Sequence, residues 1–170
     1  MLNKETKKRI DAARDILVGQ LPLPTDQIEI ITLALIYKFM DDQDELLREI
    51  GLPAKFFTDE LADYGWQNLM SKQIGAEARR DLFADAIRAF EQAKHLPTLF
   101  RQIFNNSLLR FRDAKVLSRF LEKINEFQYS HSEELGNAFE YLLQTMGAQG
   151  DNGQFRTPRN IIDFIVDVVA

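Results

Sequence analysis

The chain has 170 residues, of which 45% are hydrophobic and 28% are charged, and this composition is typical of a globular protein with a hydrophobic core. It contains no cysteine, which excludes disulfide scaffolds, thiolate zinc sites and cysteine nucleophiles. Its formal net charge is −5, whereas a domain that binds nucleic acid tightly by itself is usually basic. This charge still allows a local basic patch, or DNA binding by other parts of a longer chain.

No apolar run approaches the length of a membrane span. The N-terminal residues 1–9 are basic but lack the apolar stretch of a signal peptide. We therefore expect a soluble cytoplasmic protein that does not enter a membrane.

Metal ligands are sparse in the sequence. The two histidines, His95 and His131, are too few and too far apart along the chain to suggest a metal cluster. The acidic stretch at residues 41–45 lacks the pattern of a calcium-binding EF-hand loop, and we expect it to form an exposed acidic turn. The sequence therefore predicts no metal site.

The first part of the chain predicts two helices. Residues 4–18 carry apolar side chains at helical spacing, and the two prolines within residues 20–24 interrupt this pattern. Thr25 is the predicted N-cap of the next helix. Apolar residues then occupy nearly every face from 28 to 40, as in a helix at the centre of a bundle, and the acidic stretch predicts its end. A strand at residues 28–36 is an alternative, given their β-branched content.

The remainder also predicts helices, and no strand. Residues 52–74 indicate a packed, irregular segment with short helices. An amphipathic helix is predicted over 75–94, with one apolar side made by Ala78, Leu82, Ala86, Ala89, Phe90 and Ala93. A segment from Pro97, helices at 113–127 and 133–146, a glycine-rich loop at 147–153 and a last apolar helix from Thr157 follow. The predicted fold class is all-α, a compact multi-helix bundle.

The segment 150–159 carries the most specific chemistry. Gly150 and Gly153 allow the backbone to approach a ligand closely, and Thr157 and Pro158 suit the cap and first position of a helix. The backbone N–H groups that follow would point out of the helix start and attract a carboxylate or phosphate. The alternative is a glycine loop and a well-capped helix with nothing bound.

Residues 135–143 are Leu-Gly-Asn-Ala-Phe-Glu-Tyr-Leu-Leu, and residues 153–159 are Gly-Gln-Phe-Arg-Thr-Pro-Arg. This pair resembles a signature of the modification (DNA adenine methyltransferase) subunits of type I restriction–modification systems. The family has a Leu-Gly-x-x-Tyr/Phe-Glu-Tyr-Leu-Leu helix, followed by Gly-Gln/Glu-Phe/Tyr-x-Thr-Pro-Arg. Upstream, Lys38, Phe39 and Asp41 are similar to the end of an apolar helix of the family, which carries a lysine, an aromatic residue and an aspartate in this order.

The resemblance implies a cofactor site, because the second element of the pair is the family's motif X, which wraps the amino-acid end of S-adenosylmethionine. The residues that it assigns to one wall of this pocket are Gln154, Phe155, Arg156, Thr157, Pro158 and Arg159. The family often has an aromatic residue at the position of Arg156, so the methionine end could be held differently here.

The resemblance also implies a domain organisation. Residues 1–130 would form an N-terminal helical domain for assembly and DNA clamping, and residues 131–170 would begin the methyltransferase domain. The family's glycine-rich motif I and catalytic Asn-Pro-Pro-aromatic motif do not occur in this chain. We therefore expect a fragment truncated before motif I, whose last helix belongs to the start of an absent Rossmann-like domain.

For the intact protein, the resemblance implies methyl transfer from S-adenosylmethionine to the exocyclic amine of an adenine in DNA, with the base flipped out of the stack. Its implied partners are the specificity and restriction subunits of the same system, and double-stranded DNA in the assembled complex. No residue of this chain is predicted to be catalytic, and the chain alone is expected to be inactive.

One stripe of basic residues fits proximity to DNA. It is predicted on one helix edge and consists of Arg112, Lys115, Arg119 and Lys123. Such a stripe could neutralise phosphates, although a solvated helix edge with acidic neighbours is the alternative. Two other hypotheses stay open for the whole chain: a stand-alone all-α protein-interaction module without catalysis, and an independent helical DNA-binding domain, which the acidic net charge disfavours.

Overall fold

The computed structural model describes residues 4–105, 111–127 and 132–149, and within these ranges the chain is helical, with no β-strand. The elements in chain order are α1 (Lys4–Val18), α2 (Pro24–Glu49), the 3-10 helix η1 (Asp59–Tyr64), α3 (Trp66–Leu69), α4 (Ala76–Gln92), α5 (Thr98–Phe104), α6 (Ala114–Asn125) and α7 (Ser132–Gln149). The prediction of a compact all-α fold is confirmed. None of the described helices is long and apolar enough to span a membrane.

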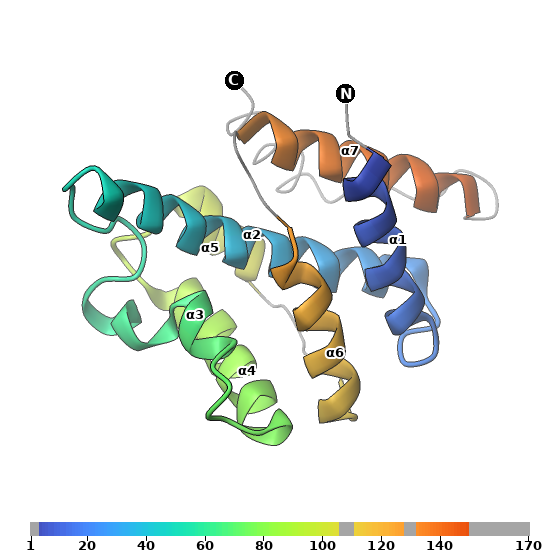
Figure 1. Cartoon of the computed structure of the whole chain (residues 1–170), viewed down its shortest axis with the longest axis horizontal. Helices are drawn as coiled ribbons and strands as arrows, with labels where there is room; N and C mark the ends of the chain where they lie inside the picture. The colour runs from blue at the N-terminus through green and yellow to red at the C-terminus, as the bar shows by residue number, and fades with distance from the viewer. Residues whose placement is uncertain (1–3, 106–110, 128–131, 150–170) are drawn as a thin grey trace.

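Helix α2 lies at the centre of the fold because apolar side chains cover every face of its first half. All residues from 30 to 41 are buried, and a helix that is apolar all round is stable only when other elements enclose it. Helices α1, α3, α6 and α7 pack against it. Figure 1 shows α2 crossing the molecule, with α1, α6 and α7 gathered around its N-terminal half. The helix prediction is confirmed and the alternative strand is not observed.

The start of α2 differs from the prediction. The helix begins at Pro24, and Leu23 takes the N-cap position with an extended backbone, so Thr25 is not the N-cap. No side chain forms a hydrogen bond at this cap. Proline explains the difference, since its fixed φ suits the first helical position and its missing N–H costs nothing there.

The end of α2 also differs, because the helix continues through the acidic stretch to Glu49. The expected exposed turn at 41–45 was wrong: Asp41 is 5% exposed and Asp44 is fully buried. Buried carboxylates are stable where hydrogen-bond donors surround them. Those donors come from later in the chain, so the local sequence pattern did not reveal them.

The carboxylate of Asp44 organises the segment that follows α2. Its Oδ1 accepts hydrogen bonds from the backbone N–H groups of Lys55 at 2.7 Å and Phe56 at 3.0 Å. Its Oδ2 accepts from Phe56 at 3.1 Å and Phe57 at 2.8 Å. These N–H groups have no helical partner, and the buried carboxylate replaces one. The predicted irregular segment with short helices is confirmed, as η1 and α3 lie within it.

Aromatic rings fill the contacts that α2 makes with this segment and with α4. The ring centroid of Tyr37 lies 4.8 Å from that of Phe90, 5.3 Å from that of Trp66, and 6.0 Å from those of Phe57 and Phe83. Edge-on and offset arrangements at such distances are favourable. Aromatic side chains therefore fill helix contacts in this part of the core.

The predicted apolar side of α4 is confirmed only in part, since Ala86 and Phe90 are buried as expected. Ala78 is exposed and Leu82 is half-buried, whereas Phe83 and Ile87 are buried. Arg79 shares this buried face, and its guanidinium donates to the carbonyl oxygens of Leu69 and Ser71, both at 2.9 Å, and to Ser118 Oγ at 3.3 Å. An arginine that is not among the residues of the predicted apolar side therefore crosslinks α4, α6 and the turn after α3.

The last two described helices are close to their predicted ranges. Helix α6 begins after Asp113, whose carboxylate caps it, and α7 begins at Ser132, one residue before its predicted start. Helix α7 extends to Gln149, so the loop predicted from residue 147 begins later. The motif at 153–159 and the last predicted helix lie outside the described residues. The first half of the paired signature, residues 135–143, lies in α7. Because α7 packs against α1 and α2, this segment is part of the same helical core.

Candidate nucleic-acid interface

The basic residues predicted near DNA lie on the solvent side of α6 and at its start. We call this set the α6 basic face, which consists of Arg112, Lys115, Arg119 and Lys123. The first three side chains are exposed and the fourth is half-buried. The rotation of α6 follows from its apolar face, where Leu117, Phe120, Leu121 and Ile124 are fully buried.

The position of α6 along the chain is set by Asp113. Its Oδ1 accepts hydrogen bonds from the backbone N–H groups of Lys115 at 2.9 Å and Val116 at 3.2 Å. Aspartate is among the best N-cap residues because it satisfies N–H groups that have no helical acceptor. This cap places Arg112 immediately before the helix and Lys115 in its first turn.

The far end of the α6 basic face carries compensating acids. Lys123 Nζ lies 3.3 Å from Glu126 Oε1 in an exposed ion pair, and Glu122 is also exposed. Such a pair contributes little to stability, but it lowers the positive potential that Lys123 presents. The positive character is therefore strongest at Arg112, Lys115 and Arg119.

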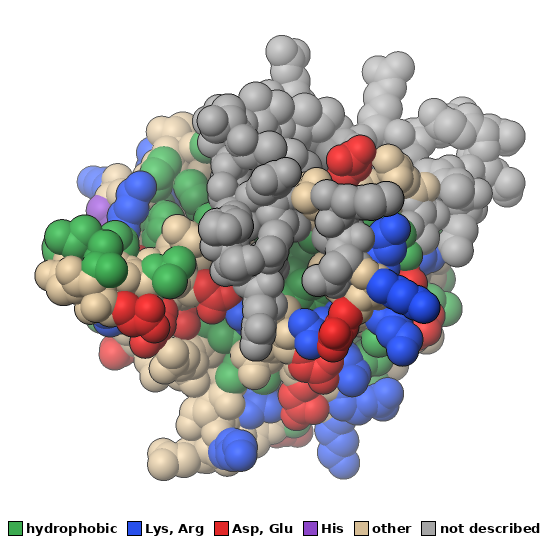
Figure 2. Space-filling model, turned by 45° about the horizontal axis from the view of Figure 1, so that its top comes forward, with side chains coloured by type: hydrophobic (Ala, Val, Ile, Leu, Met, Phe, Trp, Pro, Cys, Tyr) green, Lys and Arg blue, Asp and Glu red, His purple; other side chains and the backbone are tan. Residues whose placement is uncertain are grey.

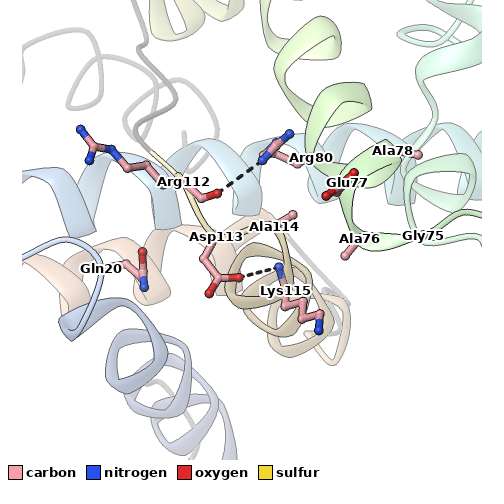
Figure 3. Close-up of a pocket in the computed structure, with 10 residues that line it drawn as sticks. All are labelled: Gln20, Gly75, Ala76, Glu77, Ala78, Arg80, Arg112, Asp113, Ala114 and Lys115. Carbon is pink, nitrogen blue, oxygen red and sulfur yellow. Dashed lines mark hydrogen bonds between the residues drawn. The ribbon is translucent and has the colours of Figure 1, made fainter.

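An open cavity of about 930 Å³ adjoins the start of α6. It is lined by the end of the α1 segment at Gln20, the first turns of α4, and residues 112–115. Its charged side chains are Arg80, Arg112 and Lys115 on the positive side, and Glu77 and Asp113 on the negative side. Figure 3 shows these groups around one opening between three chain segments.

Arg80 is a basic residue of this region that the sequence interpretation did not include. Its Nη1 donates a 3.4 Å hydrogen bond to the carbonyl oxygen of Arg112, which Figure 3 marks with a dashed line. It belongs to α4, and only the packing of α4 against α6 brings it beside Arg112. No spacing rule along the chain could have paired these two residues.

Helix α1 extends the same side of the molecule. It packs against α6 and runs in the opposite direction (Figure 1). Figure 2 shows Lys and Arg side chains where α1 and α6 lie, interleaved with Asp and Glu side chains. On α1, Arg9 and Glu5 form an ion pair, with Arg9 Nη2 at 3.1 Å from Glu5 Oε1. The surface is thus mixed in charge, which suits a contact within a larger assembly better than tight independent DNA binding.

The cofactor residues assigned by the resemblance, 154–159, lie outside the described residues, whereas the helix that precedes them is described. Leu135, Ala138 and Leu142 of α7 are fully buried. The hydroxyl of Tyr141 donates to the carboxylate of Asp11, at 3.0 Å to each oxygen, and Lys7 Nζ lies 5.5 Å from the centre of its ring. The signature helix is therefore anchored to α1, and α1 packs against α6.

A helical domain whose surface carries both basic and acidic side chains is found in many kinds of protein. We therefore compared the chain with known proteins. No protein-family model matches the chain. The chain is similar to the type I restriction enzyme EcoEI methylase subunit of Escherichia coli, with 29% identity over 70 residues. The match covers 39% of this chain and only 14% of the relative. This shows a distant relationship to a methylase subunit of a type I restriction enzyme.

Proposed function

We propose that this chain is the N-terminal helical part of a DNA adenine methyltransferase subunit of a type I restriction–modification system. The observation that carries the proposal is the similarity to the EcoEI methylase subunit. The match covers only a small part of that relative's length, and we therefore propose a part of such a subunit. The paired signature at 135–143 and 153–159 supports the same family. In the intact protein the reaction is methyl transfer from S-adenosylmethionine to the exocyclic amine of adenine.

Within that protein, we assign to the α6 basic face a contact with DNA phosphates. Cations at four-residue spacing, as at Lys115, Arg119 and Lys123, lie about 6 Å apart along a helix and follow one edge of it. Arg80 adds a further cation beside Arg112. Phosphate contacts of this kind position DNA without reading its sequence, which fits a clamp whose target sequence is read by another subunit.

The second assigned role is cofactor contact by residues 154–159. S-adenosylmethionine supplies the methyl group when bound, and its carboxylate suits backbone N–H groups at a helix start and an arginine side chain. Thr157 and Arg159 are the strongest candidates, with Gln154 next. No residue of this chain is assigned to the chemical step, and the 170-residue chain alone is predicted to be inactive.

The test uses the full-length subunit assembled with its partner subunits. Reversing all four charges of the α6 basic face to glutamate should weaken DNA binding at least tenfold and flatten its salt dependence, while S-adenosylmethionine binding stays the same. The matched control reverses four exposed basic residues elsewhere, namely Arg48, Lys72, Arg88 and Lys94. Equal loss in both variants, or no loss in the first, would reject the DNA contact.

A stand-alone protein-interaction module is the second candidate, and an exposed apolar patch favours it. Ile50 is 71% exposed, Leu52 is 50% exposed and Leu46 is 46% exposed, all near the end of α2. Figure 2 shows hydrophobic side chains gathered at that end of the molecule. Exposed apolar patches often mark protein contacts. Replacing Thr157 and Arg159 by alanine in the full-length subunit separates the candidates, since only a methyltransferase would bind S-adenosylmethionine and then lose this binding.

A further inference from the structure

Three potential metal ligands from distant parts of the chain meet at one surface site. Asp59 and Glu60 open η1, and His95 lies in the turn between α4 and α5. One side-chain ligand atom from each residue lies within 4.8 Å of the other two. All three residues are exposed, so an ion can reach them from solvent. The sequence predicted no metal site, because Asp59 and Glu60 lie far from His95 along the chain.

The imidazole of His95 is oriented by a backbone carbonyl. Its Nε2 lies 2.9 Å from the carbonyl oxygen of Phe56, which can only accept, so Nε2 carries the hydrogen. In the neutral ring this leaves a lone pair on Nδ1, and Nδ1 is the nitrogen that faces Glu60. A histidine that binds a metal through one nitrogen typically donates from the other to a carbonyl or carboxylate.

The separation between His95 and Glu60 fits two ligands of one ion. Nδ1 of His95 lies 3.6 Å from Oε1 of Glu60, which is longer than a hydrogen bond. Two ligands at about 2.0 to 2.1 Å from a tetrahedral zinc ion lie about 3.3 Å apart. A small shift of exposed side chains therefore brings both atoms to bonding distance.

We propose that Asp59, Glu60 and His95 bind a first-row divalent transition metal, with Zn²⁺ as the preferred ion and water completing its coordination. The mixture of one imidazole and two carboxylates suits such ions better than Mg²⁺, which prefers oxygen ligands alone. The ion would fasten the segment after α2 to the turn after α4. That segment is held from inside by Asp44, which accepts the backbone N–H of Phe56, the residue whose carbonyl orients His95.

The test is titration of the metal-free 170-residue chain with Zn²⁺, Co²⁺ and Mg²⁺, followed by calorimetry and, for Co²⁺, by visible absorption. We expect one Zn²⁺ or Co²⁺ per chain and no heat with Mg²⁺. His95→Ala, and the double variant Asp59→Asn with Glu60→Gln, should each weaken Zn²⁺ binding at least tenfold. His131→Ala is the matched control and should bind as the unchanged chain does.

Two results would overturn the proposal. One is the absence of stoichiometric Zn²⁺ binding to the unchanged chain. The other is equal binding by the unchanged chain and the Asp59/Glu60 double variant. That variant decides the matter if His95→Ala loses its helical circular dichroism, because both acidic side chains are exposed and their removal leaves the His95 bond to Phe56 in place.

Discussion

The carboxylate of Asp44 holds the backbone N–H of Phe56 between its two oxygens, at 3.0 Å and 3.1 Å. This relationship joins the last turns of the central helix to the irregular segment that follows it. Because Lys55 and Phe57 donate to the same carboxylate, one fully buried side chain satisfies three successive backbone donors.

Asp44→Ala should therefore destabilise the chain strongly. Three backbone N–H groups lose their acceptor, and hydrogen bonds to a charged group are the more valuable ones, so the free energy of unfolding should fall by about 2 to 4 kcal/mol. Urea denaturation followed by the fluorescence of Trp66, the single tryptophan, measures this. The exposed Asp85→Asn is the control and should change it by less than about 0.5 kcal/mol. Similar effects of the two variants would contradict the role of Asp44.

Because of Asp41, the free energy of unfolding should fall as pH rises. Burial, and then repulsion from Asp42, raise the pKa of Asp41 to about 6, whereas an unfolded aspartate has a pKa of about 3.9. The folded state thus binds this proton more tightly, and the resulting stability is fully present below about pH 4 and is lost as pH rises through about 6.

Asp41→Asn removes this proton linkage. The variant should gain stability relative to the unchanged chain between pH 4 and pH 7, measured by urea denaturation at several pH values. Asp85→Asn should show no such gain. A pH-independent difference between Asp41→Asn and the unchanged chain would contradict the raised pKa.

Tyr141→Phe should loosen the attachment of α7 to α1. The substitution removes the hydroxyl that donates to both oxygens of Asp11 at 3.0 Å, which should cost about 1 to 2 kcal/mol of unfolding free energy. Tyr64→Phe removes the hydroxyl of another half-buried tyrosine and serves as the control. A double-mutant cycle with Asp11→Ala isolates the pair, and a coupling energy near zero would show that the bond contributes nothing.

Single substitutions in the α6 basic face should differ in their effect on DNA binding by the assembled full-length subunit. Arg119→Ala should reduce the slope of log affinity against log salt by about 1, as expected for the loss of one phosphate contact. Lys123→Ala should reduce it less, because Glu126 lies 3.3 Å from its ammonium group. Fluorescence anisotropy over a salt series measures both slopes, and a larger effect at Lys123 would contradict this order.

The sequence by itself determined the all-α fold class and the central position of the helix at 28–40. It also determined that the α6 basic face is turned towards solvent. These features follow from the periodicity of apolar residues, which can be read from one segment without knowing what packs against it. The start of α6 was equally local, since Asp113 caps the two N–H groups that follow it within three residues.

Only the tertiary structure decided which polar side chains are buried, because their hydrogen-bond partners lie far away along the chain. Asp44 was expected in an exposed turn, whereas the backbone N–H groups of Lys55, Phe56 and Phe57 donate to its buried carboxylate. Arg79 is buried because Leu69, Ser71 and Ser118 accept its hydrogen bonds. Arg80 joined Arg112 for the same reason. A buried polar group is stable only with a partner, and which partner is near depends on how the helices pack, which the spacing of residues along one helix does not encode.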